Sequence, residues 1–158
     1  MNRLLLLLFI ISCSATGVAQ KRKDLKKLGI KSSVSTEITV TGTITTSKEL
    51  YNADGRVVEA YDYNKEGQLK TIKRYKYNKA GDVVEESEYT PSNVLTEKHT
   101  YAYNAMGDKT EEITTDAAGK IKKREVYTYD ARGLKTEKKT YDGDNKLLST
   151  KRFSYQTK

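Results

Sequence analysis

The sequence has no tryptophan, and proline, cysteine and histidine each occur once in 158 residues. A single cysteine excludes disulfide bonds within the chain, and the single histidine, His99, leaves little for metal or nucleophile chemistry. Only 36% of the residues are apolar, whereas 32% are charged, so a thick hydrophobic core is not expected. The 12 tyrosines become the main large side chains, which suits surfaces buried on one side and wet on the other.

The N-terminus has the pattern of a secretory signal, with a basic start, an apolar run over 4–11 and small residues after it. This stretch is too short to span a bilayer comfortably. Cleavage after Ala19 would remove a signal peptide of residues 1–19 and release a free protein. Cleavage before Cys13, in a lipobox-like Ile-Ile-Ser-Cys stretch, would remove residues 1–12 and leave a lipid on the cysteine. Both alternatives stay open, and both predict export from a Gram-negative cytoplasm, either as a periplasmic or secreted protein or as an outer-membrane lipoprotein.

The net charge of +8 is concentrated toward the two ends of the chain. Residues 20–33 are predicted to form a basic tether that precedes the folded domain. Residues 119–158 hold 12 basic and five acidic residues. Within them, Lys122, Lys123 and Arg124 are candidates for binding an anionic glycan through their summed field. The alternative is a solvated face that protects an edge strand from aggregation. Nucleic acid is not an expected partner, because the chain is exported.

A 26-residue unit recurs, as in YKYNKAGDVVEE at residue 75, YAYNAMGDKTEE at residue 101 and YTYDARGLKTEK at residue 127. Within it, glycine or asparagine recurs at alternating intervals of 12 and 14 residues, usually three residues after Asn or Asp. Asn and Asp side chains accept backbone hydrogen bonds in turns, while glycine adopts positive φ without steric cost. The pattern predicts type I turns followed by a glycine bulge. The predicted turn positions are Gly55, Gly67, Gly81, Asn93, Gly107, Gly119, Gly133 and Asn145.

The segments between these turns alternate in the manner of β-strands. In residues 69–77, Leu, Thr, Lys and two tyrosines share one face, and Lys, Ile and Arg share the other. We therefore expect an all-β fold over residues 34–158, an antiparallel meander of nine or ten strands. The sheet is expected to be either open and twisted or partly curled. The alternation of Val, Ile and Thr over residues 34–45 predicts one first strand there.

The stretches YNADGRV, YNKEGQL, YNKAGDV and YDARGLK resemble the YD repeats of RHS and teneurin-like proteins, over about residues 51–158. In that family, long antiparallel sheets form toxin-enclosing shells or extracellular adhesion and sugar-binding surfaces, without catalysis by the repeats. This chain has too few repeats to close a shell, lacks the RHS core signature and a toxin tail, and keeps a strict period of 26. The resemblance therefore implies only the hairpin architecture and an exported, non-enzymatic role. A short accessory or remnant of an RHS-like toxin system is an alternative.

One aromatic row is a candidate binding surface. Its tyrosines recur on every second strand and could stack sugar rings, although such rows are more often structural. The row comprises Tyr77, Tyr103, Tyr129 and Tyr155. The adjacent pairs Glu85-Glu86 and Glu111-Glu112 point to opposite faces of a strand, so neither pair can flank one glycosidic bond.

These observations predict no catalytic residue, no metal site and no cofactor. The expected protein is a non-enzymatic scaffold or binding module of the cell envelope. Its rival is an anionic-glycan-binding module that uses the tyrosine row and the basic end. Possible partners are an anionic glycan or an envelope protein, and a membrane is contacted only through a lipid anchor. The oligomeric state is left open.

Overall fold

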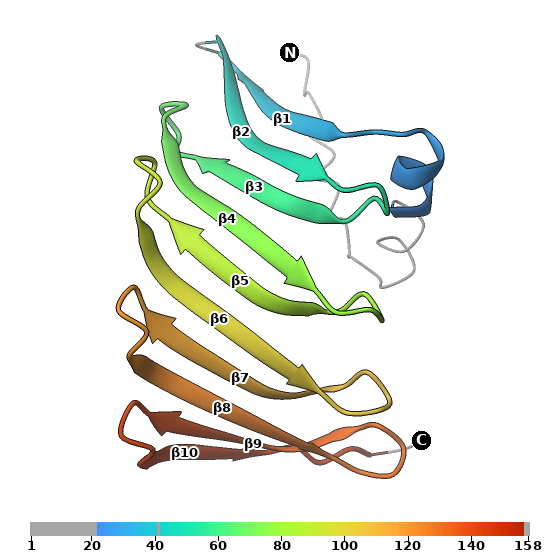
Figure 1. The fold of residues 1–158 in the computed structure, drawn as a ribbon, viewed down its shortest axis with the longest axis vertical. Helices are drawn as coiled ribbons and strands as arrows, with labels where there is room; N and C mark the ends of the chain where they lie inside the picture. Colours follow the sequence, from blue (N-terminus) through green and yellow to red (C-terminus); the bar gives the residue numbers. More distant parts are fainter. Residues whose placement is uncertain (1–21, 41, 157–158) are drawn as a thin grey trace, which may run out of the picture.

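The computed structural model describes residues 22–40 and 42–156, which form one antiparallel sheet of ten strands (Figure 1). Each strand pairs with the strands before and after it in the sequence, so the topology is a simple meander. The predicted all-β meander is confirmed. The strands are β1 (Ser32–Thr39), β2 (Gly42–Tyr51), β3 (Val57–Tyr63), β4 (Leu69–Tyr77), β5 (Val83–Tyr89), β6 (Leu95–Tyr103), β7 (Lys109–Asp116), β8 (Ile121–Tyr129), β9 (Lys135–Asp142) and β10 (Leu147–Arg152).

The turns after β2 through β9 share one backbone arrangement. In the first, the Gly55 amide donates to the Asn52 carbonyl at 3.0 Å, and the Asn52 amide donates to the Arg56 carbonyl at 2.9 Å. The Asn52 side-chain oxygen also accepts from the amides of Asp54 and Arg56, each at 3.0 Å. All eight predicted turn positions have positive φ, between 61° and 99°. The local turn chemistry thus sets where each strand ends.

The prediction of a single strand over residues 34–45 is wrong. The chain reverses between Thr39 and Gly42, so that the segment forms the end of β1 and the start of β2. Ile38 pairs with Thr43, and Thr39 pairs with Gly42. A short reversal keeps the alternation of Val, Ile and Thr unbroken in the sequence, which is why the pattern concealed it. Gly42, with φ of 139°, is the residue that permits the reversal.

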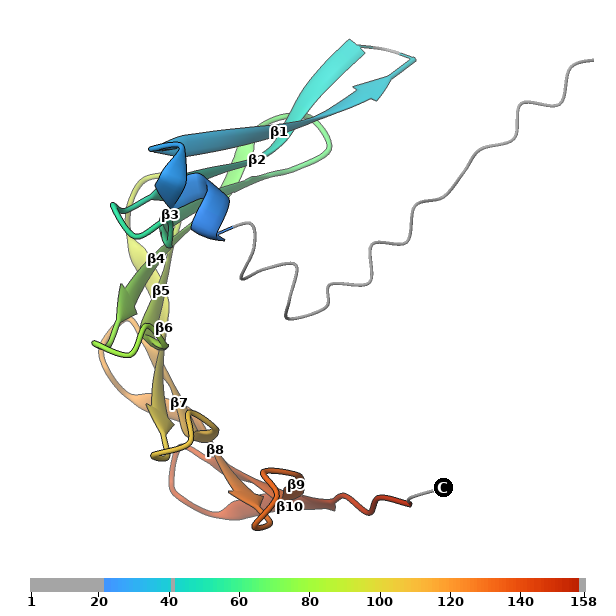
Figure 2. The same ribbon diagram turned by 90° about the vertical axis from the view of Figure 1, so that its right-hand side faces the viewer.

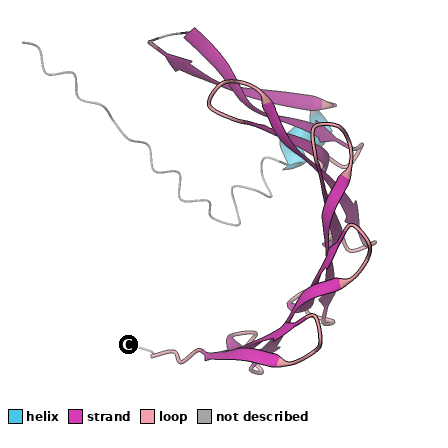
Figure 3. Ribbon diagram, turned by 90° about the vertical axis from the view of Figure 1, so that its left-hand side faces the viewer, coloured by secondary structure: helices cyan, strands magenta, loops and turns pink. Residues whose placement is uncertain are grey.

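The sheet is a single layer bent into an open arc, with β1 and β10 at its two ends (Figures 2 and 3). Of the two shapes expected, the open sheet is the observed one. Packing is shallow, because no described side chain is completely enclosed. The described residues that are buried are Tyr51, Ile72, Tyr127, Ser87, Thr114, Glu125 and the turn glycine Gly55.

Cross-strand pairing assigns the side chains to two faces. One face, the tyrosine face, carries Tyr75, Tyr101 and Tyr127 together with many carboxylates and lysines. The other face also carries aromatic residues, although the sequence suggested mainly charged ones there. On it, Ile72 lies between its pair partners Tyr61 and Tyr89 and is only 6% exposed. Both faces therefore contribute to the thin core.

A short helix over residues 22–27 contacts the first turn of the repeats. A Cβ atom at Gly55 would lie 2.6 Å from the Arg22 carbonyl oxygen, so only glycine permits this approach. Lys26 Nζ lies 2.9 Å from Asp54 Oδ1 and adds an ion pair. The helix lies in the predicted basic tether, and β1 begins at Ser32. Within the described residues, no helix has the length and apolar character needed to cross a membrane.

Candidate functional site

The tyrosine row forms a repeated tie between strands. Each hydroxyl donates a hydrogen bond to the backbone carbonyl of the residue 20 positions earlier. The ties are Tyr77 to Val57 at 2.6 Å, Tyr103 to Val83 at 2.7 Å, Tyr129 to Lys109 at 2.7 Å and Tyr155 to Lys135 at 2.8 Å. Each bond joins the end of an even-numbered strand, or for Tyr155 the segment just after β10, to the start of the odd-numbered strand directly before it, which is its hydrogen-bonded neighbour in the sheet. The hydroxyls of this predicted glycan-binding row are thus engaged by the fold, although the rings are only partly covered.

A second tyrosine set on the tyrosine face is buried more deeply. Tyr127 is 7% exposed, and its hydroxyl donates to Glu125 Oε2 at 2.8 Å. Burial and this bond raise the pKa of Tyr127. Burial also opposes ionisation of Glu125, but hydrogen bonds from Lys138 and Tyr127 outweigh it and lower the pKa of that carboxyl. The hydrogen bonds from Lys138 and Tyr127 compensate for the burial of the ionised Glu125 carboxylate in the thin sheet. This role is structural.

His99 lies among polar partners on the tyrosine face. Its Nε2 atom is 3.0 Å from Glu97 Oε1, and its Nδ1 atom is 3.2 Å from Thr114 Oγ1. The imidazole stacks on Tyr101 with ring centroids 6.4 Å apart. Across residues 22–40 and 42–156, no group of three or more His, Cys, Asp or Glu side chains is arranged to hold a metal ion.

The predicted basic cluster lies at the start of β8, and each of its members faces a carboxylate. Lys122 Nζ is 3.2 Å from Glu97, Lys123 Nζ is 3.6 Å from Glu125, and Arg124 Nε is 2.6 Å from Glu111. Tyr129 lies at the other end of the same strand, seven residues or about 23 Å away from Lys122. The structure therefore does not bring the tyrosine row and the basic cluster into one site.

Two turn positions carry a link that the sequence analysis missed. Asn93 and Asn145 replace glycine at φ values of 63° and 61°. The Arg74 Nη2 atom donates to Asn93 Oδ1 at 2.8 Å, and the Arg124 Nη1 atom donates to Asn145 Oδ1 at 3.3 Å. Glycine could not accept these bonds, so asparagine supplies both the turn conformation and an anchor for a distant arginine. An arginine lying 19 or 21 residues before each asparagine was the available signal.

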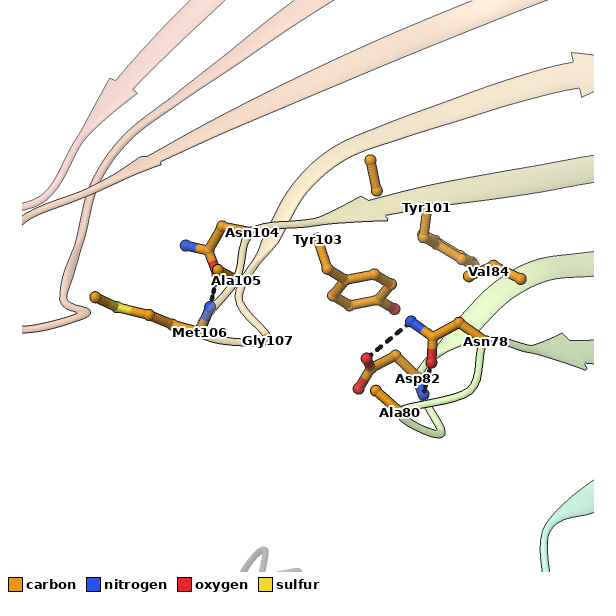
Figure 4. A pocket seen from close by; sticks show the side chains of 11 residues that line it. Asn78, Ala80, Asp82, Val84, Tyr101, Tyr103, Asn104, Ala105, Met106 and Gly107 are labelled. Atoms are coloured by element: carbon orange, nitrogen blue, oxygen red, sulfur yellow. Dashed lines mark hydrogen bonds between the residues drawn. The ribbon is translucent and has the colours of Figure 1, made fainter.

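A hollow of about 520 Å³ lies between two consecutive turns at one end of the strands (Figure 4). The rings of Tyr101 and Tyr103 form part of its wall, and Met106 lies on the neighbouring turn. Asn78 Nδ2 donates to Asp82 Oδ2 at 3.0 Å at its rim. The lining residues are Asn78, Ala80, Asp82, Val84, Tyr101, Ala102, Tyr103, Asn104, Ala105, Met106 and Gly107.

The same gap one unit earlier is filled by an arginine. The Arg56 guanidinium lies against Gly81 and 5.5 Å from the ring centroid of Tyr77. The position 26 residues later is Asp82, whose shorter side chain does not reach across. The hollow therefore lies where an arginine of one unit is replaced by an aspartate in the next. The signal in the sequence was the difference between Arg56 and Asp82 at one position of the 26-residue unit.

The predicted signal peptide and the candidate lipidation residue Cys13 lie outside the described residues.

No family model and no curated protein matches the chain. Among solved structures, it is similar to a protein of unknown function from Bacteroides fragilis, with 14% identity and a TM-score of 0.44 over 80% of this chain and 96% of that one. It is also similar to TarM, with 12% identity and a TM-score of 0.33 over 85% of this chain and 24% of that one. A third similar structure is a chain of the Photorhabdus luminescens Tc holotoxin pore, with 12% identity and a TM-score of 0.27 over 75% of this chain and 9% of that one. The chain thus spans a quarter or less of the last two. These TM-scores carry no functional argument.

Proposed function

We propose that this chain is an exported, non-enzymatic scaffold of a Gram-negative envelope, built as a short YD-like repeat sheet. The observation that supports this function is that the residues recurring in every unit serve the fold. The turn residues close the hairpins, and the hydroxyls of the tyrosine row, such as that of Tyr103, link neighbouring strands by hydrogen bonds. Positions that differ between units, such as Arg56 and Asp82, change what the surface presents. A constant frame with variable surface positions suits a scaffold that displays a binding surface.

Processing of the chain in its own host tests the exported part of this proposal. The intact mass of the purified protein should match a chain that begins at Gln20 and is found in a soluble fraction. Alternatively, it should match a chain that begins at Cys13, carries acyl chains and is found in a membrane fraction. An unprocessed chain that begins at Met1 and stays in the cytoplasm would contradict export. A hydrolase or transferase activity that one substitution abolishes would contradict the non-enzymatic role.

Glycan binding is a second candidate function, and the hollow beside Tyr103 favours it. An aromatic ring next to amide and carboxylate groups is suited to a sugar, which offers an apolar ring face and hydroxyl donors. The residues that line the hollow include the Asp82 carboxylate and no Lys or Arg, so a neutral glycan suits this hollow better than an anionic one.

Refilling the hollow provides a sharp test. Asp82→Arg copies the arginine of the preceding unit and should abolish retention on immobilised neutral oligosaccharides. Asp144→Arg makes the same charge change on an exposed residue of the turn after β9, away from the hollow, and is the matched control. Equal retention of both variants would reject the hollow as the site. Salt-dependent retention on sulfated oligosaccharides, lost on alanine substitution of Lys122 and Lys123, would assign binding to the basic cluster instead.

A further inference from the structure

The two edges of the sheet differ in how they are protected. In an antiparallel edge strand, every second residue directs its backbone N–H and C=O groups outward. Soluble proteins commonly protect such edges with lysine or proline. Strand β1 has no proline and one charged residue, Glu37, and it ends beside Ile38, which is 84% exposed. Strand β10 begins with the exposed residues Leu147 and Leu148 and carries its basic residues, Lys151 and Arg152, only at its far end.

We propose that β1 of one copy of this chain pairs antiparallel with β10 of a second copy, so that copies join head to tail. Odd-numbered and even-numbered strands run in opposite directions throughout the sheet. A β1 strand placed beside β10 therefore continues the meander with the same alternation of strand direction.

The exposed apolar residues favour this pairing over a symmetric one. The turn after β1 and the turn before β10 lie at the same end of the strands, because each is followed by an even-numbered strand. Pairing β1 with β10 therefore brings Ile38 of one copy next to Leu148 of the other. Pairing β1 with a second β1 would place Ile38 beside Ser32 or, in the next register, beside the smaller Val34, which is 57% exposed. The head-to-tail contact joins the larger exposed side chains Ile38 and Leu148 and therefore buries more apolar surface.

Charge favours the same arrangement. Residues 32–51, which form β1 and β2, hold two acidic residues and one basic residue, a net charge of −1. Residues 135–152, which form β9 and β10, hold six basic and three acidic residues, a net charge of +3. Head-to-tail pairing joins regions of opposite sign, whereas pairing two β10 strands would place +3 against +3.

The bend of the sheet determines whether a head-to-tail assembly closes into a ring or grows as a filament. Each copy contributes one open arc (Figures 2 and 3). A repeated head-to-tail contact gives a closed ring if the rotation between copies closes and an open filament if it does not.

Two variants block one edge each. Ile38→Lys places a charge on the β1 edge, and Leu148→Lys places one on the β10 edge, where the native side chain is 60% exposed. Val94→Lys is the matched control, because Val94 is 59% exposed in an internal turn. Circular dichroism establishes that all three fold. Light scattering coupled to size exclusion, over a series of concentrations, then measures their mass.

The wild type and Val94→Lys should show a mass that rises with concentration. Each edge variant alone should associate roughly tenfold more weakly or stay monomeric. An equimolar mixture of the two edge variants should form a dimer that does not grow, because one copy offers only β10 and the other only β1. A wild type that is monomeric at every concentration would overturn the proposal. So would an edge variant that associates alone as strongly as the wild type, since that outcome indicates symmetric pairing through the edge that is not blocked.

Discussion

Tyr103→Phe removes one oxygen atom and keeps the ring that packs on the sheet. The lost bond is the 2.7 Å hydrogen bond from the hydroxyl to the Val83 carbonyl. A neutral hydrogen bond contributes roughly 0.5–1.5 kcal/mol net, so we expect the free energy of unfolding to fall by about 1 kcal/mol. Tyr77→Phe and Tyr129→Phe should lose a similar amount. Tyr155→Phe should lose clearly less, because Tyr155 is 50% exposed and water can replace its hydroxyl.

The three internal ties lie on strands β4, β6 and β8. Successive ties are separated by two strand spacings, about 9.6 Å, which is near the distance at which mutational effects become additive. The triple variant should therefore lose about 3 kcal/mol, a large part of the roughly 5–15 kcal/mol that stabilises a typical domain. Each single substitution should lower the melting temperature by about 2–4 °C.

Urea denaturation followed by far-ultraviolet circular dichroism measures these losses. Tyr63→Phe is the control, because the Tyr63 hydroxyl makes no hydrogen bond to another residue within the described part of the chain. Equal losses of stability in Tyr103→Phe and Tyr63→Phe would refute a structural role for the tyrosine row, and so would the largest loss in Tyr155→Phe among the four row variants. Either result would mean that the row does not hold the strands together and that its hydroxyls are free for a ligand.

Three further predictions concern turns and ionisation. Gly107→Ala should cost about 1 kcal/mol in stability through its positive φ alone, whereas Gly55→Ala should lose more and release the short helix, visible as faster hydrogen exchange over residues 22–27. The pKa of Glu125 is lowered from its ordinary value of 4.5, so its ionised carboxylate stabilises the fold above pH 4.5. The stability difference between wild type and Glu125→Gln in urea should therefore be largest near neutral pH and shrink as pH falls below 4.5 through the lowered pKa. Burial raises the pKa of Tyr75 from 10.0 to about 12, so its contribution should be complete below pH 10 and lost as pH rises through about 12. Absorbance at alkaline pH should show late tyrosine ionisation accompanied by unfolding.

The parts of this structure that could be predicted from the sequence are those determined by neighbouring residues. The turn at Asn52 and Gly55 is specified by residues within five positions, and so is every turn like it. The Tyr103 tie and the Arg74 link to Asn93 could not be predicted, because they join residues 20 and 19 positions apart. Their contact depends on strand register and on how far each side chain reaches across the sheet.

The candidate site shows the same limit. Tyr129 and Lys122 could be assigned to one strand from the alternation, but their separation along it places them in different surroundings. The ion pairs of the basic cluster were hidden for a related reason. Glu97 and Glu111 come from other strands, and Glu125 lies two residues after Lys123 on the same strand. The charge balance of a segment does not reveal such pairing.

In this meander every strand pairs only with its neighbours in the sequence. The first and last strands, β1 and β10, form opposite edges of the sheet (Figure 1). A pull applied to both ends therefore acts across the strands and separates them one at a time from the edges. The hydrogen bonds of a strand then break in succession and not together, so the sheet should lengthen at low force in steps of one strand. A protein fixed in a cell envelope and loaded at its far edge would behave as an extensible tether that shortens again when the load is removed.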